Sequence, residues 1–154
     1  MTGPRALSRF LGAWALGANL VAAAAGTNAN ATAPDAVRAQ AREIFAHIVG
    51  IESSIGKGKV PLVAKYLADR FKAGGFADAD IHILPLGETA SLVVRYRGKG
   101  SGAKPIAFIA HMDVVTAKRS DWQRDPYTLT EENGFFYGRG TSDVKQEVDR
   151  KSVV

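Results

Sequence analysis

The sequence predicts an α/β domain in which helices are layered against a central sheet. Two segments with apolar residues at helical spacing come first, at 34–50 and 60–74. Segments of strand-forming residues follow, and one of them, 106–110, is an uninterrupted apolar run. Such a run is typical of a strand buried on both faces of a sheet. Helices that precede a hydrophobic central strand favour a layered α/β architecture, and 154 residues are a one-domain length.

Both helices carry sequence signals at their ends. Pro34 and Asp35 suit a first helical turn, and Gly50 is expected to end that helix. Pro61 opens the second helix and Gly74 stops it. The apolar stripe of the first helix consists of Val37, Ala41, Ile44, Phe45 and Ile48, and that of the second of Val60, Ala64, Leu67 and Phe71.

Short strands are expected after the helices. Residues 81–84 and 91–97 are rich in strand formers, and the glycine-rich stretch 98–102 turns the chain. Asn133 and Gly134 stand between two short runs of strand-forming residues, which is the strongest short-range signal for a β-hairpin.

Composition narrows the classes of function. With 46% hydrophobic and 23% charged residues the chain belongs to the soluble globular class. It has no cysteine, so any metal must be held by histidine and carboxylates. The formal charge of +5 falls to +2 without the two ends, because Lys+Arg drops from 20 to 16 and Asp+Glu from 15 to 14. Basic residues are not interleaved with aromatic ones, so we expect no nucleic-acid partner.

Residues 1–25 resemble an export signal. Arg5 and Arg9 precede the apolar stretch 10–25, which ends in four alanines that fit a signal-peptidase site. The alternative is an uncleaved anchor, but sixteen residues fall short of the about twenty that span a bilayer. We therefore expect a periplasmic or secreted protein without stable membrane insertion, in which 26–33 is a linker.

A candidate metal-binding motif follows the apolar run 106–110. Ligands gather beyond the carboxyl ends of strands in open α/β sheets, and His111 and Asp113 stand at such an end. Residues two apart on a strand point to the same side, so Asp113 is placed to accept the second imidazole N–H of His111. That contact fixes the tautomer of a metal-binding histidine. The alternative is a solvated pair at a strand end.

A second candidate ligand comes about thirty residues later. Gly138 and Gly140 allow a tight turn, and Asp143 stands at the expected start of a helix. A carboxylate has two oxygens and can bridge two cations about 3.5–4 Å apart, as in two-metal hydrolases. Imidazole nitrogen with carboxylate oxygen suits zinc, manganese or cobalt. The alternative for Asp143 is an ordinary helix N-cap.

Three stretches in order resemble the co-catalytic zinc exopeptidase family: IAHMDVV at 109–115, DWQRDPY at 121–127 and GFFYGRGTSDVK at 134–145. This family includes glutamate carboxypeptidase, aminoacylase, acetylornithine deacetylase and succinyl-diaminopimelate desuccinylase. The resemblance implies that 34–148 is the N-terminal part of a catalytic domain with a mixed central sheet flanked by helices.

The resemblance also implies roles for individual residues. His111 would ligate one metal, Asp143 would bridge two, and Asp113 would be the catalytic-site residue that orients His111. The cofactor would be two divalent ions, zinc first, with cobalt or manganese as alternatives. The substrate would be a small peptide or N-acyl amino acid, whose amide bond a metal-activated water attacks. The export signal favours a peptidase over a deacylase.

In the family, a Glu-Glu pair that follows the last of these motifs supplies the general base and a ligand, and a further carboxylate and a distant histidine complete the cage; the resemblance implies that these residues lie beyond the end of this sequence. Residues 149–154 read as one frame of a common sequencing adapter, so we expect a non-native tail; a natural frameshift is the rival explanation. We expect the 154-residue chain to be unstable and catalytically silent. The hypothesis of a different class is a non-catalytic fragment with at most a weak binding role.

Other polar residues are expected to be structural or exposed. Arg139 is expected to anchor its turn, and Gln146 stands where family members often have glycine. His47, His82, Asp121 and Asp125 are assigned to surface or loop positions. Ser53 and Ser54 have no partners that resemble a nucleophile triad, so we do not expect them to act as nucleophiles.

Overall fold

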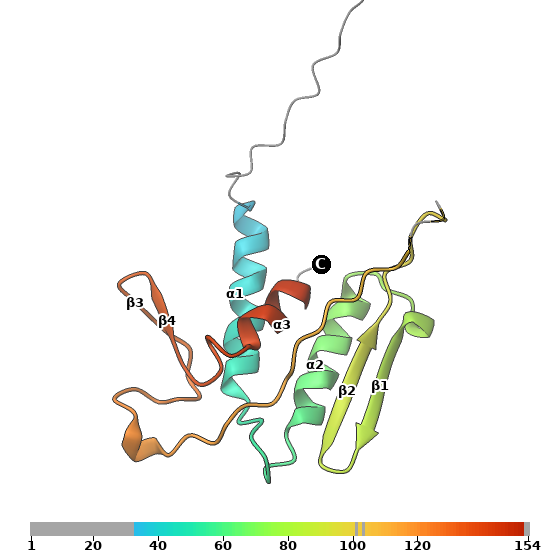
Figure 1. The fold of residues 1–154 in the computed structure, drawn as a ribbon. Coiled ribbons are helices and arrows are strands. Elements are labelled where there is room, and N and C mark those ends of the chain that lie inside the picture. The colour runs from blue at the N-terminus through green and yellow to red at the C-terminus, as the bar shows by residue number, and fades with distance from the viewer. Residues whose placement is uncertain (1–32, 101, 103, 153–154) are drawn as a thin grey trace, which may run out of the picture. The chain divides into compact units, whose positions relative to one another are not determined.

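The computed structural model describes residues 33–100, 102 and 104–152. The predicted export signal, 1–25, and all but the last residue of the predicted linker lie outside these residues. Within the described ranges, no helix is long and apolar enough to cross a membrane. The elements, shown in Figure 1, are α1 (Asp35–Gly50), α2 (Val60–Ala73), β1 (Ile81–Leu86), β2 (Thr89–Val94), β3 (Thr130–Glu132), β4 (Phe135–Tyr137), α3 (Lys145–Ser152) and the 3-10 turns Asp78–Asp80 and Arg119–Asp121.

The predicted α/β class is confirmed. Strands β1 and β2 form one antiparallel sheet, with Ile81 opposite Val94, and β3 and β4 form a second one. The β1–β2 hairpin packs against α2 (Figure 1). Parallel pairing occurs at an isolated bridge between Ser54 and Val114, which joins the loop after α1 to the candidate metal motif.

The helix boundaries follow the sequence signals closely. Helix α1 begins directly after Pro34, and its last residue is Gly50. Helix α2 has its proline in the first turn and is followed by Gly74 and Gly75. Gly75 adopts a φ of 91°, and the Phe76 amide donates to the Phe71 carbonyl at 3.1 Å, which closes the helix end.

The hydrophobic core is built by all three helices. Of the apolar stripe expected for α1, Ile44, Phe45 and Ile48 are buried, whereas Val37 near its start is exposed. The stripe expected for α2 is buried, and α3 adds one apolar residue to the core. The buried cluster comprises Ile44, Phe45, Ile48, Val49, Val63, Leu67 and Val148. The C-terminal half of α1 therefore lies at the centre of the core and fixes the loop that follows it.

Replacing Leu67 by alanine is expected to destabilise the protein by about 2–5 kcal/mol, because it leaves a cavity in the core. The Leu67 side chain is 1% exposed, whereas Leu62 on the same helix is 54% exposed. The matched control Leu62→Ala is expected to change stability by less than about 0.5 kcal/mol. Urea unfolding followed by circular dichroism measures both, and equal losses would contradict this core.

The predicted buried strand at 106–110 is wrong. Its large side chains point to solvent, with Ile106 80%, Phe108 76% and Ile109 87% exposed. The segment is extended but belongs to neither described sheet. A β-strand is stabilised by hydrogen bonds to a neighbouring strand. Among the described residues, such pairing begins only with the Ser54–Val114 bridge.

The predicted hairpin at Asn133 and Gly134 is confirmed. Asn133 and Gly134 have φ values of 53° and 80°, and Glu132 pairs with Phe135 across the turn. Two consecutive positive φ values are the requirement of a type I′ turn, which explains the Asn-Gly pair. The two strands expected at 81–84 and 91–97 form as β1 and β2 and also pair as a hairpin, which the sequence pattern does not predict, with Gly87 at a φ of 58° in its turn.

Candidate metal centre

The loop after α1 holds the His-Met-Asp motif in place. The Ser53 hydroxyl donates to the Met112 carbonyl at 2.7 Å, and the Val114 amide donates to the Ser53 carbonyl at 3.2 Å. Met112 lies between the two motif residues, and Val114 directly follows Asp113. The backbone around Asp113 is thus bound on both sides to one buried serine.

A compact loop carries Asp143. The Lys145 amide donates to the Gly140 carbonyl at 2.9 Å, which closes a turn over the residues between them. Gly140 has a φ of 87°, and a Cβ there would lie 2.8 Å from Cγ1 of Val114. Glycine is therefore required both by the backbone angle and by the space. The peptide bond between Asp143 and Val144 is cis.

The structure brings the three predicted site residues together. Nε2 of His111 lies 3.1 Å from Oδ1 of Asp143. On the other side of the ring, Nδ1 lies 3.0 Å from the Asp113 carbonyl oxygen and 3.3 Å from its carboxylate. His111 is half exposed and both carboxylates are more exposed still. The expected partnership of His111 with Asp113 is present, mainly through the Asp113 backbone.

Both ring nitrogens of His111 face acceptors. Nδ1 lies beside the Asp113 carbonyl oxygen and Nε2 beside the Asp143 carboxylate. A neutral ring carries one N–H, so either tautomer satisfies one of these contacts and turns a lone pair toward the other. Protonation of both nitrogens satisfies both contacts, and so does a metal ion at Nε2 when Nδ1–H donates to Asp113.

The pKa of His111 reflects the same arrangement. Burial lowers it, but the hydrogen bonds to the Asp113 carbonyl and the Asp143 carboxylate, with the charges of both residues, together outweigh burial. The net result is a pKa raised above the ordinary histidine value. A site that favours a cation at Nε2 is also suited to a metal ion, which competes with the proton for the same lone pair.

The donor set fits a divalent metal such as zinc. Two ligands on one tetrahedral zinc, each about 2.0–2.1 Å from the metal, are about 3.3 Å apart, close to the 3.1 Å between Nε2 and Oδ1. In the part of the chain described, no cluster of three or more His, Asp or Glu side chains forms a metal cage. These residues therefore supply two ligands, His111 and Asp143, while Asp113 lies at the far nitrogen of the ring.

A hollow of about 350 Å³ opens beside the pair. Trp122 lines it, and the Arg139 guanidinium lies 5.0 Å from the centroid of the Trp122 ring. The Arg139 amide donates to the Pro126 carbonyl, and Arg139 also lines the hollow. The hollow therefore has an aromatic wall next to the candidate ligands.

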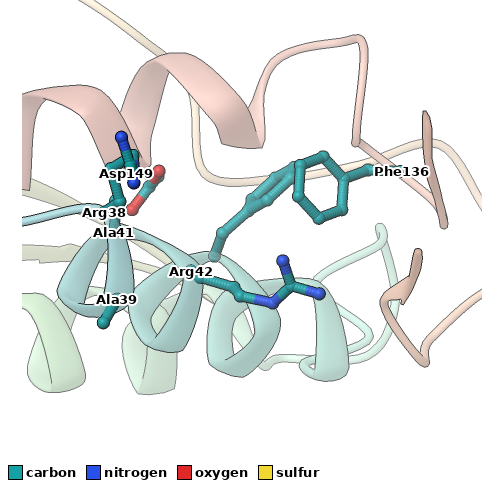
Figure 2. Close-up of a pocket in the computed structure, with 7 residues that line it drawn as sticks. Arg38, Ala39, Ala41, Arg42, Phe136 and Asp149 are labelled. Atoms are coloured by element: carbon teal, nitrogen blue, oxygen red, sulfur yellow. The ribbon is translucent and has the colours of Figure 1, made fainter. Parts of the chain in front are cut away.

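A second hollow, of about 410 Å³, lies among α1, β4 and α3 (Figure 2). Arg42 extends from α1, with its guanidinium 5.4 Å from the Phe136 ring centroid. Burial raises the pKa of the Asp149 carboxyl, on α3, to about 7. None of the three predicted site residues lines this hollow.

The residues assigned to structural or surface positions largely occupy them. His47 and His82 are exposed, and His47 stacks on Tyr66. Asp125 caps its loop by accepting from the Tyr127 amide at 2.9 Å and the Thr128 hydroxyl at 3.0 Å. Asp125 and both histidines therefore have the roles that the sequence predicts.

Two residues of the site environment were not singled out by the sequence. Ser53 was considered only as a nucleophile, yet it is fully buried against the metal motif. Lys145 is also fully buried, and burial lowers the pKa of its ammonium to about 8. The position of Lys145 two residues after Asp143 was the available signal; Ser53 carried none.

Residues 107–148 match the peptidase family M20/M25/M40. The matched stretch contains His111, Asp113 and Asp143, so it coincides with the residues that the geometry brings together. The match over this stretch supports the resemblance, while the assignment among the carboxypeptidase, aminoacylase and deacylase branches stays a prediction.

A crystal structure of human carnosine dipeptidase 1 is similar to this chain, with 28% sequence identity and a TM-score of 0.47. The similarity covers 74% of this chain and 27% of that one. The chain therefore spans about a quarter of the length of this relative.

Proposed function

We propose that this chain contributes to a metal-dependent peptidase that cleaves the amide bond of small peptides, with N-acyl amino acids as the alternative substrates. In this proposal His111 and Asp143 are the metal ligands and Asp113 positions His111. The observation that supports it most is the 3.1 Å contact between Nε2 of His111 and the Asp143 carboxylate, while Nδ1 is engaged by Asp113.

Asp113 and Asp143 have different roles in this proposal. By accepting from Nδ1, Asp113 leaves the Nε2 lone pair free to bind a cation. Asp143 turns one oxygen to His111 and is 83% exposed, so its second oxygen is accessible to a second cation. Divalent ions bound there, zinc first with cobalt or manganese as alternatives, would polarise the amide carbonyl and lower the pKa of a water molecule.

Zinc binding tests the ligand assignment. The 154-residue chain is expected to bind Zn²⁺ in a calorimetric titration, and His111→Gln is expected to remove the binding, because Nε2 is lost. The double variant His47→Gln/His82→Gln, which changes the two other histidines of the chain, serves as the control and should bind as the wild type does. Equal binding by His111→Gln would refute the proposal.

The stoichiometry separates the proposal from its rival. Two tightly bound equivalents indicate a complete two-metal site, whereas fewer equivalents indicate a half-site in a non-catalytic fragment. Hydrolysis of a dipeptide and of an N-acetyl amino acid, assayed with and without Zn²⁺, then tests turnover. Metal-dependent turnover by the 154-residue chain would overturn our expectation that it is catalytically silent.

We also propose that the protein is periplasmic or secreted, on the evidence of the charged and apolar pattern in 1–25. This location suits the degradation of peptides better than a biosynthetic deacylation. Mass spectrometry of the protein recovered from the host periplasm is expected to show a mature N-terminus between residues 25 and 33. An unprocessed N-terminus in the cytoplasm would contradict export.

A further inference from the structure

Ser53 binds the backbone of the His-Met-Asp motif from a distant part of the chain. Its side chain is completely buried, and its hydroxyl and carbonyl contact Met112 and Val114, about sixty residues away. Neither contact involves a candidate ligand directly. Together they fix the path of the backbone that carries His111 and Asp113.

Lys145 binds the loop that carries Asp143 to the end of α1. Its ammonium donates to the Ile48 carbonyl and, at 2.8 Å, to the Ile51 carbonyl, both at the C-terminal end of α1. A buried ammonium is costly unless it is hydrogen-bonded, and the negative end of a helix dipole is a favourable place for it. The Lys145 side chain passes beside Gly140, and its own amide closes the Asp143 loop.

The two sets of contacts meet at a single carbonyl. The Ile51 carbonyl accepts from the Lys145 ammonium and also from the Ser53 amide, the latter at 2.8 Å. Ser53 therefore binds the backbone next to His111, and Lys145 binds Ile51 from a position two residues after Asp143. Both ends of the segment from His111 to Asp143 are thus hydrogen-bonded to residues 51–53. Because the C-terminal half of α1 lies in the core and Ile51 packs against it, residues 51–53 hold a defined position relative to both the His111 motif and the Asp143 loop.

We propose that residues 51–53 form a scaffold that sets the distance between His111 and Asp143, with Ser53 and Lys145 as positioning residues. The inference depends on the proposed function only for the identity of what binds between the ligands. The positioning itself concerns two side chains of this chain, and it is measurable without any metal.

Ser54 offers a matched control for Ser53. Both serines are buried neighbours on the same loop, but within the described structure the Ser54 hydroxyl has no hydrogen-bond partner. Ser54→Ala keeps the backbone bridge to Val114 and removes an oxygen that binds nothing there. Ser53→Ala removes one hydroxyl of the same kind, and with it the bond to Met112.

The test measures how strongly Asp143 affects the His111 ring. In metal-free protein at a fixed pH, Asp143→Asn should shift the His111 ring signal in a ¹H–¹³C NMR spectrum, which His111→Gln assigns. We expect the same shift in the Ser54→Ala background. In the Ser53→Ala and Lys145→Met backgrounds, we expect it to fall to less than half, because the two side chains no longer meet.

The outcomes decide the proposal in each case. A full shift in Ser53→Ala and Lys145→Met, or an equal loss in Ser54→Ala, would overturn it. Should Ser53→Ala unfold by circular dichroism, Ser53→Cys, which keeps the size and a weak donor, should fold and give an intermediate shift. Unfolding of Ser53→Ala, Ser53→Cys and Lys145→Met alike would also count against it, because the residues would then serve stability in general.

A zinc titration of the same variants separates this inference from the proposed function. Loss of a residue that positions a ligand typically weakens metal binding by about 10–100-fold, so Ser53→Ala should show a loss in this range and Ser54→Ala none. If the wild type binds no Zn²⁺, the metal proposal fails. The NMR shift in metal-free protein still decides whether the scaffold sets the distance.

Discussion

Replacing Asp143 by asparagine is expected to weaken Zn²⁺ binding by about a hundredfold or more. Changes that only disturb how a ligand is held already cost about 10–100-fold, and this change removes the charge of a ligand itself. Asparagine keeps the size and one oxygen of the side chain. The loss therefore measures the negative charge that faces Nε2 of His111 at 3.1 Å.

Asp121→Asn is the matched control for this prediction. Asp121 is also an exposed aspartate, and it contacts the neighbouring Ser120 hydroxyl rather than His111. Calorimetric titration of both variants with Zn²⁺ should show wild-type affinity for Asp121→Asn. A similar loss in the two variants would mean that general negative charge, and not a ligand, attracts the metal.

The features that the sequence predicted well are those encoded by neighbouring residues. Helices α1 and α2 follow from apolar spacing within a few turns and from prolines and glycines at their ends. The Asn133-Gly134 hairpin follows from two residues that accept positive φ. In each case the interactions that decide the structure lie within about fifteen residues along the chain.

The apolar run 106–110 shows where such reasoning fails. Its composition indicates a buried strand, but a strand also requires partners that come from elsewhere in the chain. The described residues place none beside it, so Ile106, Phe108 and Ile109 are exposed. The hydrophobicity of a segment indicates that it tends to be buried, but it does not indicate which other part of the chain would pack against it.

The candidate site divides in the same way. The spacing of His111 and Asp113 is local and indicated their contact directly, whereas the approach of Asp143 rested on the family resemblance. The contacts of Ser53 and Lys145 span 59 to 97 residues and follow no periodic pattern. Residues that bind ligands have recognisable types, but residues that hold ligands in place are recognised only from the folded structure.

Replacing Gly140 by alanine is expected to destabilise the protein by about 2–5 kcal/mol, through two separate effects. The φ of 87° is strained for any residue with a Cβ, and the new Cβ would lie 2.8 Å from Cγ1 of Val114 and 3.2 Å from two carbons of Lys145. Val114 is fixed to Ser53 and Lys145 to Ile51, so neither neighbour moves without breaking a hydrogen bond.

Gly87→Ala isolates the first of these effects. Gly87 also has a positive φ, 58°, but a Cβ there would meet no atom within 4 Å. It should therefore show only backbone strain, about 1–2 kcal/mol. Urea unfolding of both variants measures the difference. A loss for Gly140→Ala no larger than that for Gly87→Ala would mean that Val114 and Lys145 yield freely, and the Asp143 loop would then not be held against the His111 motif by close packing.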